Sequence, residues 1–323
     1  MIRYLKVTSD IDIERQSSSI GVSVSLYICI QIFGDIMAKK IVVIGAGAAG
    51  MMAAITAGKT ADVLLIEKND RVGKKLFITG KGRCSVTNAG DADVFFNSVV
   101  TNSKFMYSSF YSFDNNMVMD FLEKASCPLK VERGGRVFPV SDHSSDVIGA
   151  FKTLINRNHN IKLLTDSKVL QIKCEDGQVT GVVIQEKENK KNREIDCDAV
   201  IVATGGMSYP LTGSTGDGYK WAEKCGHTIK ELSPSLVPFE IEEKCCRDKN
   251  VDLHIKCGKK KIFDEQGEML FTHFGISGPL VIKASAYIHR YIGKEIELYI
   301  DLKPAMDEQM LDARIQKDFS KYV

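Results

Sequence analysis

The stretch IVVIGAGAAGMMAAI, residues 41–55, is the strongest indication of the fold in this 323-residue chain. It begins with four β-branched residues in a row, a pattern typical of a parallel strand that is buried on both faces. The turn that follows has the spacing G-x-G-x-x-G: Gly45 permits a tight turn, Gly47 lets the backbone approach a pyrophosphate, and Gly50 allows close packing of a helix. The stretch therefore predicts the strand, turn and helix of a dinucleotide-binding α/β unit.

A second strand is predicted at Val63–Ile66, directly before Glu67. In units of this type an acidic residue about 20 residues after the first glycine accepts hydrogen bonds from the adenosine ribose. The N-terminus of the intervening helix directs its amides and its positive dipole end at the phosphates. The predicted cofactor contacts are Gly45, Ala46, Gly47, Ala48, Ala49, Gly50, Glu67 and Lys68.

The composition is that of an ordinary globular protein, with 44% hydrophobic residues and a formal charge of +2. So small a charge creates no field that would favour nucleic acid or an anionic membrane as a partner, so we expect a small-molecule substrate instead. The 9 cysteines lack paired spacing, which argues for a reducing compartment and a cytoplasmic protein. The oligomeric state is left open.

One cluster resembles a metal site at first sight: Cys245, Cys246, His254 and Cys257. Zinc ligands usually come as separated pairs, and adjacent cysteines seldom both face one ion, so we expect no metal here. Cys84 is a candidate redox thiol, but it lacks a Cys-x-x-Cys partner, and a structural role is the preferred interpretation.

The first 36 residues differ in character from the rest and are interpreted as a spurious or flexible extension. Their apolar stretch, residues 20–33, is too short to span a bilayer and no small-residue cleavage site follows it. Met37 directly precedes the first predicted strand, where many Rossmann proteins begin, so we expect Met37 to be the true start.

The glycine fingerprint alone does not separate FAD from NAD, and later segments favour FAD. Residues 73–88, GKKLFITGKGRCSVTN, form a basic glycine-rich loop where NAD dehydrogenases usually continue with plain strands and helices. Residues 199–206, AVIVATGG, predict a strand that ends in a turn able to approach a bound cofactor. An NAD-dependent dehydrogenase is therefore disfavoured.

Five segments, KKLFITGKGRCSVTN, GGRVFPVSD, VIVATGGMSYPLTGSTGDGY, LSPSLVPF and GEMLFTHFGISGP, resemble the BaiN-like (YhiN-like) flavoprotein family in content and order. The resemblance extends from about Lys39 to Pro304. It implies the α/β fold class, an FAD-binding Rossmann-like domain with an inserted β-rich domain, and extended FAD. Members of the family are described as aminoacetone oxidases and as reductases of unsaturated bile-acid intermediates.

The resemblance also implies further cofactor contacts. Thr79, Gly80, Gly82, Arg83 and Asn88 would approach the pyrophosphate and flavin, and Thr204, Gly205 and Val169 would pack near the cofactor. Ser85 stands where the family usually has asparagine, which puts one polar contact near the flavin in doubt.

Three strands, residues 161–164, 169–173 and 179–185, are predicted to form a small antiparallel meander. From residue 233 the pattern changes to alternating strands, with a hairpin turn expected near Glu265–Gly267. The expected domains are residues 37–232 for FAD binding and an incomplete insertion at 233–323, with the family's final FAD-domain segment absent.

The leading functional hypothesis is an FAD-dependent oxidoreductase that transfers hydride between flavin and a small amino ketone or enone. The other redox partner is either NAD(P)H, as a transient electron donor, or oxygen. The alternative is a truncated, non-catalytic remnant that binds FAD weakly or not at all. Tyr209, His273 and Ser277 are candidates for the substrate cleft between domains. The alternative interpretations are that Tyr209 is a turn residue and that His273 is a hydrogen-bonded core histidine. No catalytic base is predicted.

Overall fold

The computed structural model describes residues 39–188, 190–240, 250–273 and 275–320. The interpretation of residues 1–36 and the predicted roles of Cys245 and Cys246 lie outside these residues. The described chain forms two compact units, residues 39–230 and 231–320.

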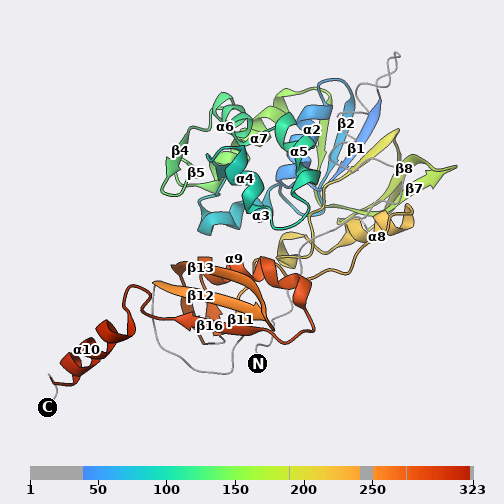
Figure 1. The fold of residues 1–323 in the computed structure, drawn as a ribbon. Coiled ribbons are helices and arrows are strands. Elements are labelled where there is room, and N and C mark those ends of the chain that lie inside the picture. The colour runs from blue at the N-terminus through green and yellow to red at the C-terminus, as the bar shows by residue number, and fades with distance from the viewer. Residues whose placement is uncertain (1–38, 189, 241–249, 274, 321–323) are drawn as a thin grey trace. The chain divides into compact units, whose positions relative to one another are not determined.

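A parallel sheet organises the first unit (Figure 1). Its strands are β1 (Lys40–Ile44), β2 (Asp62–Ile66), β6 (Ile161–Leu164) and β10 (Ala199–Val202), in the order β10-β1-β2-β6. The strands pair in continuous register, with Ile44 opposite Ile66 on one side and Val202 on the other. The strand–turn–helix predicted from residues 41–55 is therefore confirmed, and its strand β1 is an inner strand of the sheet.

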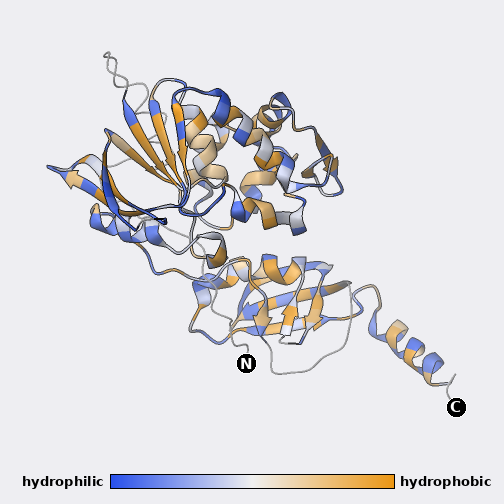
Figure 2. Ribbon diagram, turned by 180° about the vertical axis from the view of Figure 1, so that it is seen from behind, coloured by the Kyte–Doolittle hydropathy of each residue, from blue (hydrophilic) through white to orange (hydrophobic). Residues whose placement is uncertain are grey.

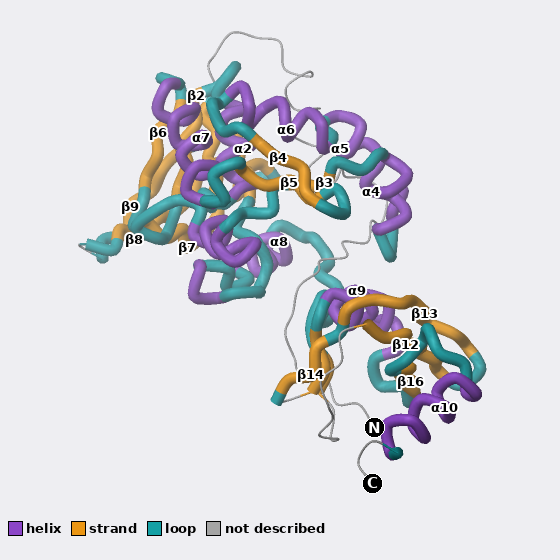
Figure 3. Tube along the Cα trace, turned by 90° about the vertical axis from the view of Figure 1, so that its left-hand side faces the viewer, coloured by secondary structure: helices purple, strands orange, loops and turns teal. Residues whose placement is uncertain are grey.

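The two faces of this sheet are covered by different layers. Val43, Val63 and Leu65 face helices α2 (Ala48–Ala57) and α7 (Ser144–Arg157), which Figure 3 shows beside each other. The alternate residues Val42, Ile44 and Ile66 pack against a second sheet and helix α8 (Asp217–Lys224). Because successive side chains of a strand point to opposite faces, a continuous apolar run fills both cores. Figure 2 shows this concentration of hydrophobic residues on the central strands.

The second sheet of this unit is antiparallel and consists of β7 (Ser167–Glu175), β8 (Gln178–Glu186) and β9 (Asn192–Asp196) in sequence order. The predicted meander is therefore correct in kind but wrong in membership. Ile161–Leu164 pairs in parallel with β2 instead. The reason is that this segment follows α7, and a strand reached through a crossover helix returns parallel to its neighbour.

The segment between β2 and α7 is mostly helical. Its elements are α3 (Lys74–Ile78), η1 (Thr79–Gly82), α4 (Ala92–Ser98), η2 (Ser103–Met106), α5 (Tyr107–Ser112), α6 (Asn115–Lys124) and a small antiparallel sheet of β3 (Thr87–Asn88), β5 (Arg136–Pro139) and β4 (Leu129–Glu132). A short η3 (Pro210–Thr212) precedes α8.

The second unit has two antiparallel sheets. One orders β13 (Lys260–Glu268), β12 (Asn250–Cys257) and β16 (Glu297–Asp301), and the other β11 (Phe239–Glu240), β15 (Gly275–Ser277) and β14 (Leu270–Thr272). Helices α9 (Pro279–Ile288), η4 (His289–Tyr291) and α10 (Glu308–Phe319) complete it. The hairpin turn expected near Glu265–Gly267 is wrong, because β13 continues through these residues and the chain reverses at Gly258, which has a φ of 56°.

Within the described residues, no helix combines the length and the apolar character needed to cross a bilayer.

Candidate cofactor-binding site

A cavity of about 790 Å³ opens at the carboxyl ends of β1, β2 and β10 in the first unit. It is lined there by Ile44, Ile66 and Val202, the last residues of the three strands, and by the turns that follow them. The volume lies in the range of about 300–1,000 Å³ typical of small-molecule sites. Ligands of open α/β sheets bind outside the carboxyl ends of the strands, so the position is that of a cofactor pocket.

The three fingerprint glycines meet three different surroundings. A Cβ on Gly45, where φ is 100°, would lie 2.6 Å from the carbonyl oxygen of Ala203, and one on Gly50 would lie 1.7 Å from the carbonyl oxygen of Gly45. A Cβ on Gly47 would meet nothing within 4 Å, because this residue faces the cavity. Gly50 is buried and does not line the cavity, so its role is packing of α2 against β1, whereas Gly47 leaves room for a ligand.

Helix α2 presents free amides to the cavity. Gly47 is its N-cap residue and supplies no side-chain hydrogen bond, and its first turn holds no acidic side chain. Ala48 and Ala49 in that turn line the cavity. The positive end of the helix dipole therefore stays available for an anion.

Glu67 is nearly buried, with 8% of its surface exposed. One carboxylate oxygen accepts a hydrogen bond from the Ala46 amide at 2.8 Å, and the other accepts from the Asn69 amide at 2.9 Å and from its side chain. A carboxylate has about four acceptor positions, so roughly one remains for a ribose hydroxyl. Glu67 thus holds the glycine-rich turn in shape, and its contact with ribose stays a prediction.

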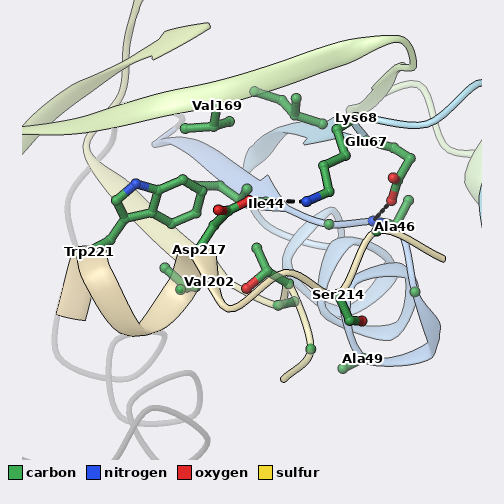
Figure 4. Close-up of a pocket in the computed structure, with 18 of the residues that line it drawn as sticks. Ile44, Ala46, Ala49, Glu67, Lys68, Val169, Val202, Ser214, Asp217 and Trp221 are labelled. Atoms are coloured by element: carbon green, nitrogen blue, oxygen red, sulfur yellow. Dashed lines mark hydrogen bonds and ion pairs between the residues drawn. The ribbon is translucent and has the colours of Figure 1, made fainter. Parts of the chain in front are cut away.

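Lys68 reaches across the cavity to a residue that the sequence reasoning missed. Its ammonium lies 3.0 Å from the carboxylate of Asp217 and donates to the Thr215 hydroxyl at 2.7 Å (Figure 4). Burial favours the neutral acid, but hydrogen bonds from Lys68 and Thr215 outweigh it and hold the pKa of Asp217 below its usual value. Asp217 lies within the segment that carried the family resemblance, which was the available signal.

The other end of the cavity is apolar. Val169 of β7 and Trp221 of α8 face Ile44 and Val202 of the main sheet there (Figure 4). This end suits a flat hydrophobic ring, whereas the glycine-rich end suits charged or polar groups. Val169, Thr79, Thr204 and Gly205, all predicted cofactor contacts, line the same cavity.

Four other predicted contacts, Gly80, Gly82, Arg83 and Asn88, are not among the residues that line this cavity. The Arg83 guanidinium binds the carboxylates of Glu132 and Asp142 and lies 4.1 Å from the centre of the Phe138 ring. Hydrogen bonds from Arg83 lower the pKa of Glu132, and those from Lys130 and Arg83 lower the pKa of Asp142.

Asn88 is likewise occupied by its neighbours. It donates to the Gly134 carbonyl at 2.8 Å and accepts from the Gly90 amide at 2.8 Å. The side chains of Arg83 and Asn88 therefore secure the β3–β5–β4 region, and their contact with a cofactor stays a prediction.

The three cleft candidates are divided between the two units. Tyr209 is 65% exposed and has a φ of 54°, just before η3. His273 and Ser277 belong to the second unit, where His273 follows β14 and Ser277 is the last residue of β15. A shared cleft stays a prediction.

The position of Cys84 does not favour a redox role. Cys84 is fully buried in the core beneath α2, and burial raises its pKa. In the described part of the chain, no three His, Cys, Asp or Glu side chains are grouped so that they could hold a metal ion.

Comparison with known proteins gives the chain's relatives. Residues 39–284 match the family described as HI0933-like protein Rossmann domain. The chain is 29% identical over 296 residues to the 3-dehydro-bile acid delta(4,6)-reductase of Clostridium scindens, covering 88% of this chain and 68% of that protein. It is 27% identical over 277 residues to the ribosomal RNA dihydrouridine synthase of Escherichia coli, covering 83% and 66%.

Among solved structures, a quinol fumarate reductase FrdA from E. coli aligns with a TM-score of 0.47 and 18% identity, covering 68% of this chain and 38% of that one. The chain spans about two thirds of the length of the curated relatives it matches, 68% and 66%.

Proposed function

The chain belongs to the HI0933-like family of Rossmann-domain proteins, and from this premise we propose that it binds FAD in the cavity of its first unit and acts as an FAD-dependent oxidoreductase. The observation that carries the proposal is the cavity at the carboxyl ends of β1, β2 and β10, into which the open side of Gly47 faces. This is where a dinucleotide lies in a Rossmann-like fold.

The residues present fit such a cofactor. The free amides of α2 and the space beside Gly47 suit a pyrophosphate, and the remaining acceptor position of Glu67 suits a ribose hydroxyl. The apolar end beside Val169 and Trp221 offers a place for one of the two ring systems. When bound, FAD would supply hydride transfer, and the protein would contribute placement and electrostatics.

The names of the curated relatives support an enone-type substrate over an amino ketone. A delta(4,6)-reductase that acts on a 3-dehydro bile acid and an enzyme that makes dihydrouridine both saturate a carbon–carbon double bond conjugated to a carbonyl. The proposal is therefore reduction of such a bond, with NAD(P)H as the source of electrons. The formal charge of +2 favours a small substrate over ribosomal RNA.

The proposal is tested on the full chain by a visible absorption spectrum, followed by titration of the colourless protein with FAD. Reduction of the bound flavin by NADH or NADPH without oxygen comes next. A steroid enone, or a uridine-containing RNA oligonucleotide, is then added to the reduced protein, and an amino ketone to the oxidised protein.

We expect the enone to restore the oxidised flavin spectrum. Reoxidation only by the oligonucleotide would replace the small substrate with RNA, and bleaching of the oxidised flavin by the amino ketone would reverse the direction of the reaction. A folded chain that takes up no FAD would overturn the proposal as a whole.

A further inference from the structure

Lys75 places an ammonium group at the cavity without a carboxylate beside it. It belongs to α3, it is half-buried, and it lines the cavity. Its Nζ donates to the Ser208 hydroxyl at 3.2 Å. No acidic side chain in the described residues forms an ion pair with it, and burial lowers the pKa of its ammonium group.

Two of the other lysines on the same cavity, Lys68 and Lys74, are committed to other groups, and the remaining one, Lys168, is exposed to solvent. The ammonium of Lys74 lies 2.8 Å from the Asp70 carboxylate, and that of Lys68 lies 3.0 Å from Asp217. A half-buried cation is costly unless an anion compensates it, so the unpaired state of Lys75 points to a ligand.

Ser214 supplies an independent observation. It is 6% exposed and lines the cavity, and its hydroxyl has no hydrogen-bond partner within the described residues. Figure 4 shows it in the cavity wall with Ala46 and Ala49. The residue is largely buried and the described residues around it offer the hydroxyl no partner, so a ligand in the cavity can provide one.

Gly205 brings the two groups together. Its φ is 71°, and a Cβ on it would lie 2.8 Å from the Ser214 hydroxyl oxygen and 3.8 Å from the Lys75 Nζ. The preceding residue adjoins the glycine-rich turn, because a Cβ on Gly45 would lie 3.1 Å from the Cα of Thr204. The Lys75–Ser214 pair therefore borders the space served by the α2 amides.

We propose that Lys75 and Ser214 form an anion subsite that binds the pyrophosphate of the cofactor. Lys75 supplies a positive charge and Ser214 donates a hydrogen bond. The inference rests on the proposed binding of FAD. The α2 amides contribute partial charge only, and the carboxylates of Glu67 and Asp217 face the same cavity. A dianionic pyrophosphate therefore needs a full positive charge that Lys68, paired with Asp217, does not supply.

The test compares the affinities of the full chain for FAD, ADP and riboflavin by calorimetry. Lys75→Met should weaken both FAD and ADP by at least about tenfold, the loss of one charge-assisted hydrogen bond, and leave riboflavin unchanged. Lys75→Arg should retain most of the affinity, and Ser214→Ala should weaken both nucleotides by a few-fold. Lys59→Met removes the same charge at an exposed position after α2 and should change none of the three.

Thermal unfolding of the cofactor-free variants separates ligand binding from a structural role. Lys75→Met should unfold no earlier than the wild type, because it removes an uncompensated charge. Unchanged ADP affinity in Lys75→Met would overturn the assignment, and a loss for FAD alone would move Lys75 to the flavin instead. A wild-type chain that binds neither nucleotide would overturn FAD binding itself, a result visible before any variant is made.

Discussion

The two glycine-rich segments of the first unit, residues 45–50 and residues 73–88, were both expected to hold the cofactor, and they use glycine for different reasons. In the first, glycine is required at positions 45 and 50 because a Cβ would clash with a carbonyl oxygen, and at position 47 because a side chain would enter the cavity. In the second, Gly82 has a φ of 87° with open space around it. Close contact or the cavity therefore requires glycine at positions 45, 47 and 50, with a left-handed conformation in addition at Gly45, whereas Gly82 requires glycine for backbone conformation alone.

The charged residues of the two segments differ in the same way. Glu67, which belongs with the first, binds amides at residues 46 and 69, close to it in the βαβ unit. Arg83 in the second binds Glu132 and Asp142, from strands β4 and the turn after β5. The contacts of the first segment can therefore be predicted from residue spacing. The partners of Arg83 cannot, because they depend on contacts between segments far apart in the chain.

The largest expected effect is on packing at Gly50. Gly50→Ala places a Cβ 1.7 Å from the Gly45 oxygen, so α2 must move away from β1 and the chain should lose more than about 3 kcal/mol of unfolding free energy. Chemical denaturation measures this loss. The control is Gly149→Ala in α7, where a Cβ meets nothing and helix propensity should add up to about 1 kcal/mol. Equal stability of the two variants would show that the glycines of the fingerprint are not set by contact.

Gly47→Leu should act on binding instead. Its side chain would enter the cavity, so FAD affinity should fall by more than about 100-fold, or roughly 2.7 kcal/mol. The unfolding free energy of the cofactor-free chain should change by no more than about 1 kcal/mol, the cost of a poor N-cap residue. Flavin titration checks the first quantity and denaturation the second. Retention of FAD would mean that the open side of the turn is not the cofactor side.

Arg83→Met tests the role of the second glycine-rich segment. At neutral pH the variant should unfold at a lower temperature, because Glu132 and Asp142 lose the guanidinium that holds their pKa values down. A carboxylate with a lowered pKa in the folded state contributes stability above its unfolded pKa, about 4, and loses it as pH falls through the folded value.

The unfolding temperatures of wild type and Arg83→Met should therefore converge below about pH 4, as scanning calorimetry at several pH values would reveal. FAD affinity should fall far less than in Gly47→Leu. A loss of FAD affinity as large as that of Gly47→Leu would show that Arg83 contacts the cofactor, as the family resemblance implies.

The smallest effect is expected at Gly82. Gly82→Ala forces a residue with a Cβ into a left-handed conformation, at a cost of about 1–2 kcal/mol, with no clash and no change in FAD affinity. Gly177→Ala in the β7–β8 turn has a φ of 77° and equally open surroundings, so its cost should match. A much larger loss at Gly82, measured by urea denaturation, would indicate a contact that the open space does not suggest.

The strands β1, β2 and β10, the glycine-rich turn and the family could be predicted from the amino-acid sequence. These follow from local rules, because a β-branched run, a fixed glycine spacing and a terminal acid each constrain the backbone within one βαβ unit. Thr204 and Gly205, which line the cavity, were also predicted near the cofactor, from the glycine turn after a buried strand and from the family resemblance.

The contacts between distant segments could not be predicted and are seen in the folded structure alone. It placed Ile161–Leu164 in the parallel sheet rather than the meander, and joined Arg83 to two carboxylates. It also brought Ser214 and Asp217 to the cavity beside Lys75 and Lys68. The physical reason is that hydrogen bonds and ion pairs depend on distance in space. Residues 49 to 149 positions apart in the chain share no local sequence pattern from which their contact could be predicted.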